Sequence, residues 1–338
     1  MNIQQAIGQV IQSNTLSRSE MTLVMKEIMS GECTDAQIGG LLIALRMKGE
    51  TVDEITAAAE VMASLSSRVN VSTPNAIDIV GTGGDGTSTF NVSTAAAFVA
   101  AGAGACVAKH GNRSVSSQSG SADLLEQAGA NLNLDAEQVS RVIEQAGVGF
   151  MFAPMHHSAM KHAIGPRKEM AVRTIFNLLG PLTNPAKVKR HVVGVFEPAL
   201  TVTIADVLAQ LGSEHSLVVH SDDGMDEISI AAPTQVAEIK NGAVQSYQIA
   251  PEQFGINRAP IESIVVANAQ ESLQLIDQAL DGIKGPARDI VILNAGAGIY
   301  VSGIASNLED GVELAAESID SGSALSAKNK FVSETQQV

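Results

Sequence analysis

Glycines crowd one short polar loop of the sequence, 81–86 (Gly-Thr-Gly-Gly-Asp-Gly), directly after an apolar run at 77–80. Because glycine has no Cβ, the backbone amides of such a loop can approach and surround an anion. Residues 91–94 (Asn-Val-Ser-Thr) then precede an alanine-rich run, which predicts the start of a helix whose free N–H groups and dipole favour phosphate. The sequence therefore predicts a phosphate-binding site, with an ordinary turn between strand and helix as the alternative.

The loop differs from the common nucleotide-binding motifs. It lacks the Gly-Lys-Ser/Thr ending of a Walker motif, and its glycines do not have the spacing of a dinucleotide fingerprint. ATP and NAD are therefore disfavoured as ligands.

A second polar segment, 109–117 (Lys-His-Gly-Asn-Arg-Ser-Val-Ser-Ser), follows the apolar run 105–108. Open α/β sheets bind ligands at the carboxyl ends of their strands. Lysine and arginine supply charge there, while serines and backbone amides supply directed hydrogen-bond donors. A solvated basic turn would explain the two cations but not the length of the polar segment, so we interpret it as part of the anion site.

An acidic run, 222–227 (Asp-Asp-Gly-Met-Asp-Glu), follows the expected strand at 216–220. Neighbouring carboxylates at a sheet edge suit Mg²⁺, which is commonly held by a few carboxylates together with substrate phosphates. Acidic loops are also frequent in a chain of net charge −15. From the residues alone, a metal site and a solvated loop both stay open.

The region 153–185 contributes further candidates. His156, His157 and His162 do not have the spacing of a zinc motif and have no cysteine partner. Arg167 could grip a substrate carboxylate through two parallel hydrogen bonds or could form a surface ion pair, and the sequence leaves both open. No Ser-His-Asp or Cys-His arrangement typical of a hydrolase can be made out.

The composition limits the classes of partner. The net charge of −15 over 338 residues argues against a broad basic surface for nucleic acid or an anionic membrane. The longest apolar run, 95–108, is broken by glycines and is shorter than a membrane span. Two cysteines without a recognisable leader fit a reducing compartment. We therefore expect a cytoplasmic protein.

The elements that must position these residues fall into two types. Residues 1–68 show helical periodicity with capping boxes at 17–20 and 51–54. After Pro74, short β-branched runs alternate with helices, which is typical of an α/β layer. Asn241-Gly242 separates two further strand patterns and predicts a hairpin, so the sheet is expected to be mixed. Helical periodicity returns from Ser272, and the polar tail after Lys328 is expected to fray.

Five strings, in this order and spacing, resemble the anthranilate phosphoribosyltransferase family: 81–85, 91–94, 109–117, Arg-Thr-Ile-Phe-Asn-Leu-Leu-Gly-Pro-Leu-Thr-Asn-Pro at 173–185, and Asp-Glu at 226–227. The resemblance covers essentially the whole chain. It implies a nucleoside phosphorylase/phosphoribosyltransferase-like fold, in which an α/β domain with a mixed central sheet carries a separate small all-helical domain. We expect the helical domain at 1–70, joined by a helical segment near 165–190, and the α/β catalytic domain at 71–338.

The resemblance also implies the activity. The 5-phosphoribosyl group of phosphoribosyl pyrophosphate would pass to the amine of anthranilate with release of pyrophosphate, the second step of tryptophan biosynthesis from chorismate. A homodimer formed through the helical domain is expected, and an anthranilate synthase subunit is a candidate partner. The alternatives are a pyrimidine nucleoside phosphorylase-like enzyme and a non-catalytic nucleic-acid-binding paralogue.

The site residues implied by the resemblance fall into three groups, and none is assigned as a catalytic acid or base. Those for phosphoribosyl pyrophosphate are Gly81, Gly84, Asp85, Thr89, Asn91, Val92, Ser93, Thr94, Lys109, His110, Gly111, Asn112, Arg113, Ser114, Val115, Ser116, Ser117 and Ser121. Those for anthranilate are Gly81, His110, Asn112 and Arg167. Those for Mg²⁺ are Ser93, Asp226 and Glu227.

Overall fold

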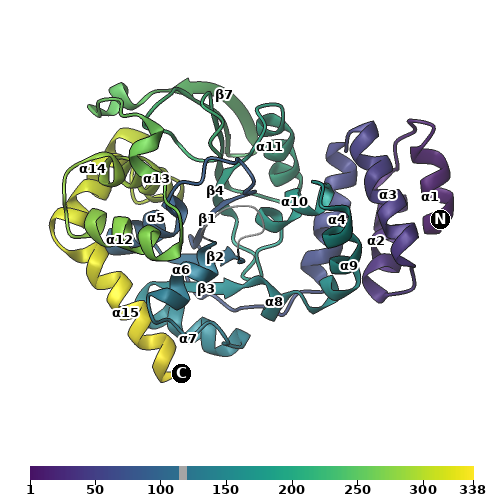
Figure 1. Cartoon of the computed structure of the whole chain (residues 1–338), viewed down its shortest axis with the longest axis horizontal. Helices are drawn as coiled ribbons and strands as arrows, with labels where there is room; N and C mark the ends of the chain where they lie inside the picture. The colour runs from purple at the N-terminus through teal and green to yellow at the C-terminus, as the bar shows by residue number, and fades with distance from the viewer. Residues whose placement is uncertain (114–119) are drawn as a thin grey trace.

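A helical bundle lies beside a larger α/β part in the structure, a computed structural model that describes residues 1–113 and 120–338 (Figure 1). The bundle begins with the N-terminal helices and is completed by helices from the middle of the chain that pack against them. Its members are α1 (Ile3–Val10), α2 (Arg18–Ser30), α3 (Asp35–Lys48), α4 (Val52–Ser64), α9 (Lys161–Met170) and α10 (Ile175–Leu179).

Side-chain caps fix where the bundle helices start. Ser17 and Glu20 form a capping box at α2, and Thr51 and Glu54 form one at α4, so both sequence predictions are confirmed. In each box the hydroxyl and the carboxylate satisfy amides that the first turn of a helix leaves unpaired.

The described residues of the α/β part contain one mixed sheet in the order β3-β2-β1-β4-β5-β6-β7. The first five of these strands run parallel to one another. β6 is antiparallel to β5, and β7 is antiparallel to β6. Their bounds are β1 (Ile77–Gly81), β2 (Val107–Gly111), β3 (Val148–Phe152), β4 (Arg190–Gly194), β5 (His215–Ser221), β6 (Thr234–Lys240) and β7 (Ala243–Ile249). The hairpin at Asn241-Gly242 is confirmed, because both residues have positive φ between β6 and β7.

Both faces of the sheet are covered, because successive strand residues point to opposite sides. Val192 and Leu217 pack into one hydrophobic core, and their neighbours Val193 and Val218 pack into another. The first core lies under helices α5, α7 and α12 to α15, and the second is shared by α11 and the bundle. The helices not yet bounded are α5 (Val92–Gly102), α6 (Ser121–Gln127), α7 (Ala136–Ala146), α8 (Ala153–His156), α11 (Leu200–Gln210), α12 (Ala269–Leu280), α13 (Pro286–Ser302), α14 (Leu308–Asp320) and α15 (Ser323–Gln337).

Two features of the α/β part differ from the sequence prediction. The strand β3 was not predicted, because its residues are all buried and show no alternation. The tail after Lys328 does not fray but continues as α15 to Gln337. Phe331 anchors it by packing its ring 5.7 Å from that of Phe98, which offsets the polar composition of the tail. None of the helices among the described residues is long and apolar enough to cross a bilayer.

Glu54 is the most consequential polar residue of the bundle. It is fully buried and accepts hydrogen bonds from Leu16 N (2.9 Å) and Thr51 N (2.8 Å), and its Oε2 lies 2.9 Å from Lys48 Nζ. Replacing Glu54 by alanine would leave the ammonium group and the Leu16 amide without this partner. We expect Glu54→Ala to lower the free energy of unfolding by about 3–5 kcal/mol, measured by urea denaturation.

Glu20→Ala is the matched control, because it removes the same kind of capping carboxylate at the protein surface. Its loss of stability should be clearly smaller. Equal losses would mean that the buried ion pair adds nothing to the cap.

Candidate active site

The glycine loop and the acidic segment lie against each other at the carboxyl end of β1. Gly83 N donates a hydrogen bond to Asp226 Oδ2 at 2.7 Å. A Cβ at Gly81 would collide with the same carboxylate, so this position requires glycine. Gly83 and Gly84 have φ of +66° and +81°, which side chains rarely adopt. The loop is therefore shaped around Asp226.

Helix α5 begins beside this loop, as the sequence predicts. Asn91 caps it by accepting from Thr94 N at 3.0 Å. Ser93 Oγ donates to Asn91 Oδ1 at 3.3 Å, and Asn91 Nδ2 donates to Ser121 Oγ at 3.3 Å. Thr94 Oγ1 is buried and has no hydrogen-bond partner within the described part of the chain. The helix start thus presents amides and an unsatisfied hydroxyl, which suits an anion.

Lys109 is a buried cation beneath the loop. Only 3% of its surface is exposed, and its Nζ donates to Ile79 O (2.5 Å) and Ser93 Oγ (3.1 Å). Burial lowers the pKa of Lys109, and the nearby carboxylates Asp78, Glu227 and Asp226 oppose that shift. The lysine therefore neutralises buried acid groups while holding Ser93 in place.

The acidic residues crowd together. Burial, and next the charge of Asp85, raise the pKa of Asp226 to about 7. Burial of its carboxyl group and the charge of Asp226 raise the pKa of Glu227 well above its ordinary range. Ser221 Oγ fixes this segment by donating to Glu227 O at 2.6 Å. Converging carboxyl groups that resist ionisation fit a divalent cation, which would relieve their repulsion.

The cation would need further ligands. Among the described residues, no three acidic, histidine or cysteine side chains form a complete metal-binding group. Mg²⁺ keeps waters and binds substrate phosphates in addition to a few protein oxygens, so the residues fit a metal shared with a phosphorylated ligand. His162 packs against Gly31 at the end of α2.

His110 and His157 form a pair of buried imidazoles, with ring centroids 5.0 Å apart. Burial is the main cause that lowers the pKa of His110 to about 3 and that of His157 to about 4, so both rings are neutral at ordinary pH. His110 Nδ1 lies 3.1 Å from Gly180 O. Because a carbonyl only accepts, Nδ1 carries the proton and Nε2 is an acceptor. Neither Nε2 atom has a hydrogen-bond partner among the described residues.

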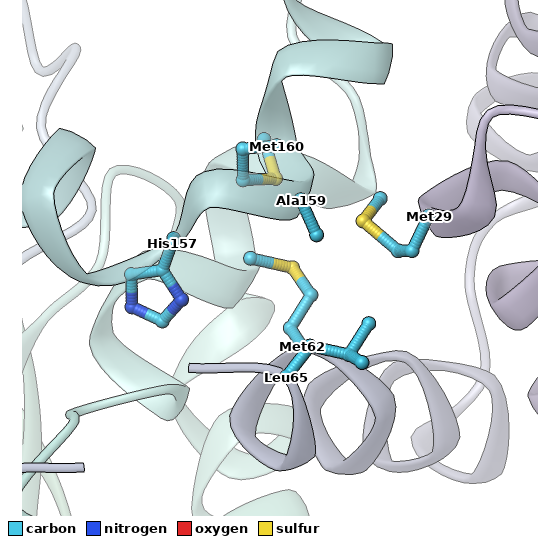
Figure 2. Close-up of a pocket in the computed structure, with 6 residues that line it drawn as sticks. All are labelled: Met29, Met62, Leu65, His157, Ala159 and Met160. Carbon is cyan, nitrogen blue, oxygen red and sulfur yellow. The ribbon is translucent and has the colours of Figure 1, made fainter. Parts of the chain in front are cut away.

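His157 was not among the predicted site residues. Figure 2 shows its ring beside an apolar crevice formed by methionines of α2, α4 and the segment after α8. The residues lining it are Met29, Met62, Leu65, His157, Ala159 and Met160. Its contact with His110 makes His157 a candidate for the site, and no sequence spacing reveals that contact.

Arg167 projects from α9 with its guanidinium 5.3 Å from the centroid of the Phe176 ring. It is half-buried, and burial lowers its pKa. Within residues 1–113 and 120–338 no carboxylate or carbonyl pairs with it. A desolvated cation without a counter-ion is a receptor for a carboxylate. This observation favours the substrate-binding interpretation over the surface ion pair.

Other predicted residues lie around the same strand ends with partners of their own. Asn112 Oδ1 accepts from Arg113 N at 2.7 Å. Arg113 is exposed and pairs with Asp123 (2.9 Å) and Glu126 (2.6 Å). Thr89 forms an isolated bridge with Val265.

The rest of the predicted set divides between packing positions and an undescribed segment. Val92 is buried in the core, and a Cβ at Gly111 would meet Phe150. The predictions for Ser114, Val115, Ser116 and Ser117 lie outside the described residues.

Asn184 and Asp78, which were not predicted as part of the site, form a buried polar pair next to His110. Asn184 Nδ2 donates to Asp78 Oδ2 (2.8 Å) and to Ala108 O (2.9 Å), while His110 N donates to Asp78 Oδ1 (3.1 Å). Burial raises the pKa of Asp78 to about 6. The pair ties the turn that contains Gly180 to β1 and β2. An aspartate within an apolar strand pattern was the available signal.

Family models match both parts of the chain. The helical bundle domain of a glycosyl transferase family matches residues 4–66, and the a/b domain of a glycosyl transferase family matches residues 73–325.

Curated relatives match along nearly the full length. Anthranilate phosphoribosyltransferase of Marinomonas sp. (strain MWYL1) is 62% identical over 339 residues, covering 99% of this chain and 98% of the relative. The enzyme of the same name from Teredinibacter turnerae is 56% identical and covers 99% of both chains.

Solved structures match in fold. Anthranilate phosphoribosyltransferase from Thermus thermophilus has a TM-score of 0.93 at 42% identity, covering 98% of this chain and 99% of that one. The Saccharomyces cerevisiae enzyme in complex with PRPP and Mg has a TM-score of 0.91 at 28% identity, covering 99% and 98%.

The crowding of Asp226 leads to a prediction for Asp226→Asn. The folded-state pKa of about 7 lies above the ordinary value of 3.8, so the fold loses stability as pH rises from about 4 to about 7 and carries the full cost of the ionised group above that. At pH 8 without metal, the variant should melt at least as high as the wild type. Saturating Mg²⁺ should raise the melting temperature of the wild type by a few degrees and leave the variant unchanged, measured by calorimetry.

Asp222→Asn is the control, since this exposed carboxylate of the same run only accepts from Gln248 Nε2 at 3.2 Å. It should keep the wild-type response to Mg²⁺. A full response in Asp226→Asn would contradict a metal-binding role for that residue.

Proposed function

The chain belongs to the anthranilate phosphoribosyltransferase family, and from this premise we propose which of its residues hold the two substrates and how they align them. The enzyme transfers the phosphoribosyl group of phosphoribosyl pyrophosphate to anthranilate in tryptophan biosynthesis. Neither a nucleoside phosphorylase nor a nucleic-acid-binding paralogue is therefore retained. The site residues, the metal and the oligomeric state are our proposals.

The glycine loop and the start of α5 would hold phosphoribosyl pyrophosphate. The Thr94 hydroxyl has no hydrogen-bond partner among the described residues, so it offers a donor without displacing one, and the dipole at the start of α5 favours an anion beside it. We propose that Gly84, Asp85, Thr89, Lys109 and Ser121 complete this site and that the other residues of 109–117 contribute further contacts. Lys109 acts mainly through its charge, because its ammonium already donates to Ile79 O and Ser93 Oγ.

Ser93, Asp226 and Glu227 would hold Mg²⁺. Support comes from the raised pKa values of the two acids and from the yeast relative, whose complex contains PRPP and Mg. Bound there, the metal would neutralise charge on the departing pyrophosphate. Hydrogen bonds within the chain would orient these ligands: Gly83 N donates to Asp226, and Lys109 Nζ donates to Ser93.

Anthranilate would be held by its carboxylate at Arg167. The carrying observation is the half-buried guanidinium that lacks any protein counter-ion in the described chain. Gly81, His110 and Asn112 are the other proposed contacts, and we add His157 because its ring packs beside that of His110 and its Nε2 likewise has no partner among the described residues. The neutral His110 Nε2 can accept a hydrogen bond from the amine, which orients the nitrogen lone pair.

No dedicated base is needed to make the amine nucleophilic, because an aryl amine is largely unprotonated at neutral pH; the proton that the nitrogen loses after attack passes to water or to the departing pyrophosphate. The reaction is an inversion at the anomeric carbon with an oxocarbenium-like transition state. Its rate then depends on holding the amine in line with the leaving pyrophosphate and on donors that stabilise the developing charge.

We propose that the chain divides into domains at 1–70 and 71–338. A second copy of the chain would dock on the helical bundle. A shallow, largely apolar groove of about 620 Å³ runs over α1, α3 and α9. At its edge Ile11 is 68% exposed and Met47 is 84% exposed, which is costly for a monomer.

The free Cys33 and Cys106 support a cytoplasmic location. Association with an anthranilate synthase subunit stays a prediction.

Arg167→Gln tests the anthranilate site. Loss of a charge-assisted carboxylate contact costs about 1.5–3 kcal/mol, so kcat/KM for anthranilate should fall by about 10- to 100-fold. The KM for phosphoribosyl pyrophosphate should change little. Steady-state kinetics that follow the loss of anthranilate fluorescence measure both values, with a chelator to test the need for Mg²⁺.

Lys168→Gln is the matched control, because Lys168 is the exposed cation next to Arg167 on α9. It should behave like the wild type. Parallel effects of Arg167→Gln on both substrates would remove Arg167 from the acceptor site.

Met47→Glu tests the dimer. A charge in the apolar groove should shift the protein from dimer to monomer in sedimentation velocity at micromolar concentration. Ile283→Glu, an equally apolar exposed position in the α/β part at 57% exposure, should leave the assembly intact. A dimer that survives Met47→Glu and dissociates with Ile283→Glu would move the interface elsewhere.

A further inference from the structure

Arg173 reaches from the helical bundle to the glycine loop. It lies between α9 and α10, and both of these helices pack on the bundle. Its Nη2 donates a hydrogen bond to Gly84 O, and its guanidinium lies 4.1 Å from the centroid of the Phe196 ring. Phe196 follows β4 in the α/β part. One side chain therefore links the two parts of the molecule at the predicted phosphate loop.

The glycine loop is held at successive residues, and Arg173 supplies its contact from the bundle. Thr82 N donates to Gly194 O at 2.9 Å, and Phe196 N donates to Thr82 Oγ1 at 3.2 Å. Gly83 N donates to Asp226. These contacts all come from the α/β part, whereas Gly84 O receives its hydrogen bond from Arg173. The position of Gly84 thus depends on α9 and α10.

The fit at Gly84 leaves no spare room. A Cβ there would lie 3.1 Å from Arg173 Nη2 and 3.2 Å from its Nε. The Arg173 guanidinium occupies the space that a side chain at Gly84 would fill. It also stacks on the ring of Phe196. An arginine that only extended into solvent would not meet the backbone so closely.

Arg167 and Arg173 flank one sharp turn of the chain. Helix α9 carries Arg167 and ends at Ala171, whose φ of 50° is left-handed. At the start of α10, Asn177 Oδ1 then accepts a hydrogen bond from Thr174 N at 3.0 Å. The turn is short and fixed at both ends, so the two arginines move together. One points to the proposed acceptor site and the other to the proposed phosphoribosyl loop.

We propose that Arg173 is a positioning residue, which sets the distance between the amine of the anthranilate bound at Arg167 and the anomeric carbon of the phosphoribosyl group bound at the glycine loop. This inference rests on the substrate assignments proposed above. Arg173 acts through Gly84 O and not by touching the reacting atoms. Its removal lets the loop shift relative to α9, and a misplacement of about 1 Å can cost about 100-fold in rate.

Arg173→Gln is the central test. The kcat should fall by about 10- to 100-fold and the KM for phosphoribosyl pyrophosphate should rise, while the KM for anthranilate stays within about twofold because Arg167 is untouched. Arg173→Lys should recover part of the kcat, since an amine can donate to Gly84 O but cannot stack as a plane on Phe196. Hydrogen exchange of the loop amides should accelerate in Arg173→Gln.

Phe196→Leu extends the test, because Arg173 can act on the loop only while the ring supports it. Losses from Arg173→Gln and Phe196→Leu should be clearly less than additive in the double variant. Arg258→Gln, which removes an exposed arginine paired with Glu252, is the control and should match the wild type.

Three results would overturn the inference. These are unchanged kcat in Arg173→Gln, additive losses in the double variant, and a fall in melting temperature with parallel changes in both KM values, which indicates a purely structural contact. Arg167→Gln is assayed alongside. If Arg167→Gln leaves the KM for anthranilate unchanged, the substrate assignment fails; if Arg167→Gln behaves as expected and Arg173→Gln does not, only the role of Arg173 fails.

Discussion

The burial of opposite charges beneath one sheet edge is the constraint on which the site depends. Lys109 lies in the interior together with Asp78, Asp226 and Glu227. A buried ammonium group or carboxylate is costly unless it is paired. The strands must therefore keep a register that brings these residues together, and β1 aligned with β2 and β4 does so. The cluster holds one cation against three acids, which leaves it suited to an additional divalent cation.

The same constraint explains how an acidic protein accommodates a highly charged anion. A net charge of −15 provides no general attraction for pyrophosphate. In the proposed site the attraction is local and comes from backbone amides of the glycine loop and α5, from Lys109 and from the proposed Mg²⁺. The loop can serve this purpose only because glycine at position 81 leaves space for the Asp226 carboxylate. The Asp226 carboxylate thus affects both the shape of the glycine loop and the charge of the site.

The acceptor side obeys a different rule. The cation of Arg167 comes from α9, a helix from the middle of the sequence that joins the N-terminal bundle. Its guanidinium packs on Phe176 and lacks a partner among the described residues. In the proposed arrangement the anionic donor lies at the sheet and the anionic acceptor at the bundle. The contact between Arg173 and Gly84 joins these two parts of the molecule.

Local features could be predicted from the sequence alone: the glycine loop, the cap at Asn91, the capping boxes at Ser17 and Thr51, and the hairpin at Asn241-Gly242. Each depends on residues a few positions apart, whose backbone preferences act before the chain is folded. The motifs were also sufficient to indicate the family. The tertiary structure alone decided that His157 pairs with His110, that Asn184 binds Asp78, that Arg173 meets Gly84, and that Phe331 keeps the tail helical. These contacts join residues far apart in sequence, and they form only when the sheet and the bundle pack, so no spacing along the chain could reveal them.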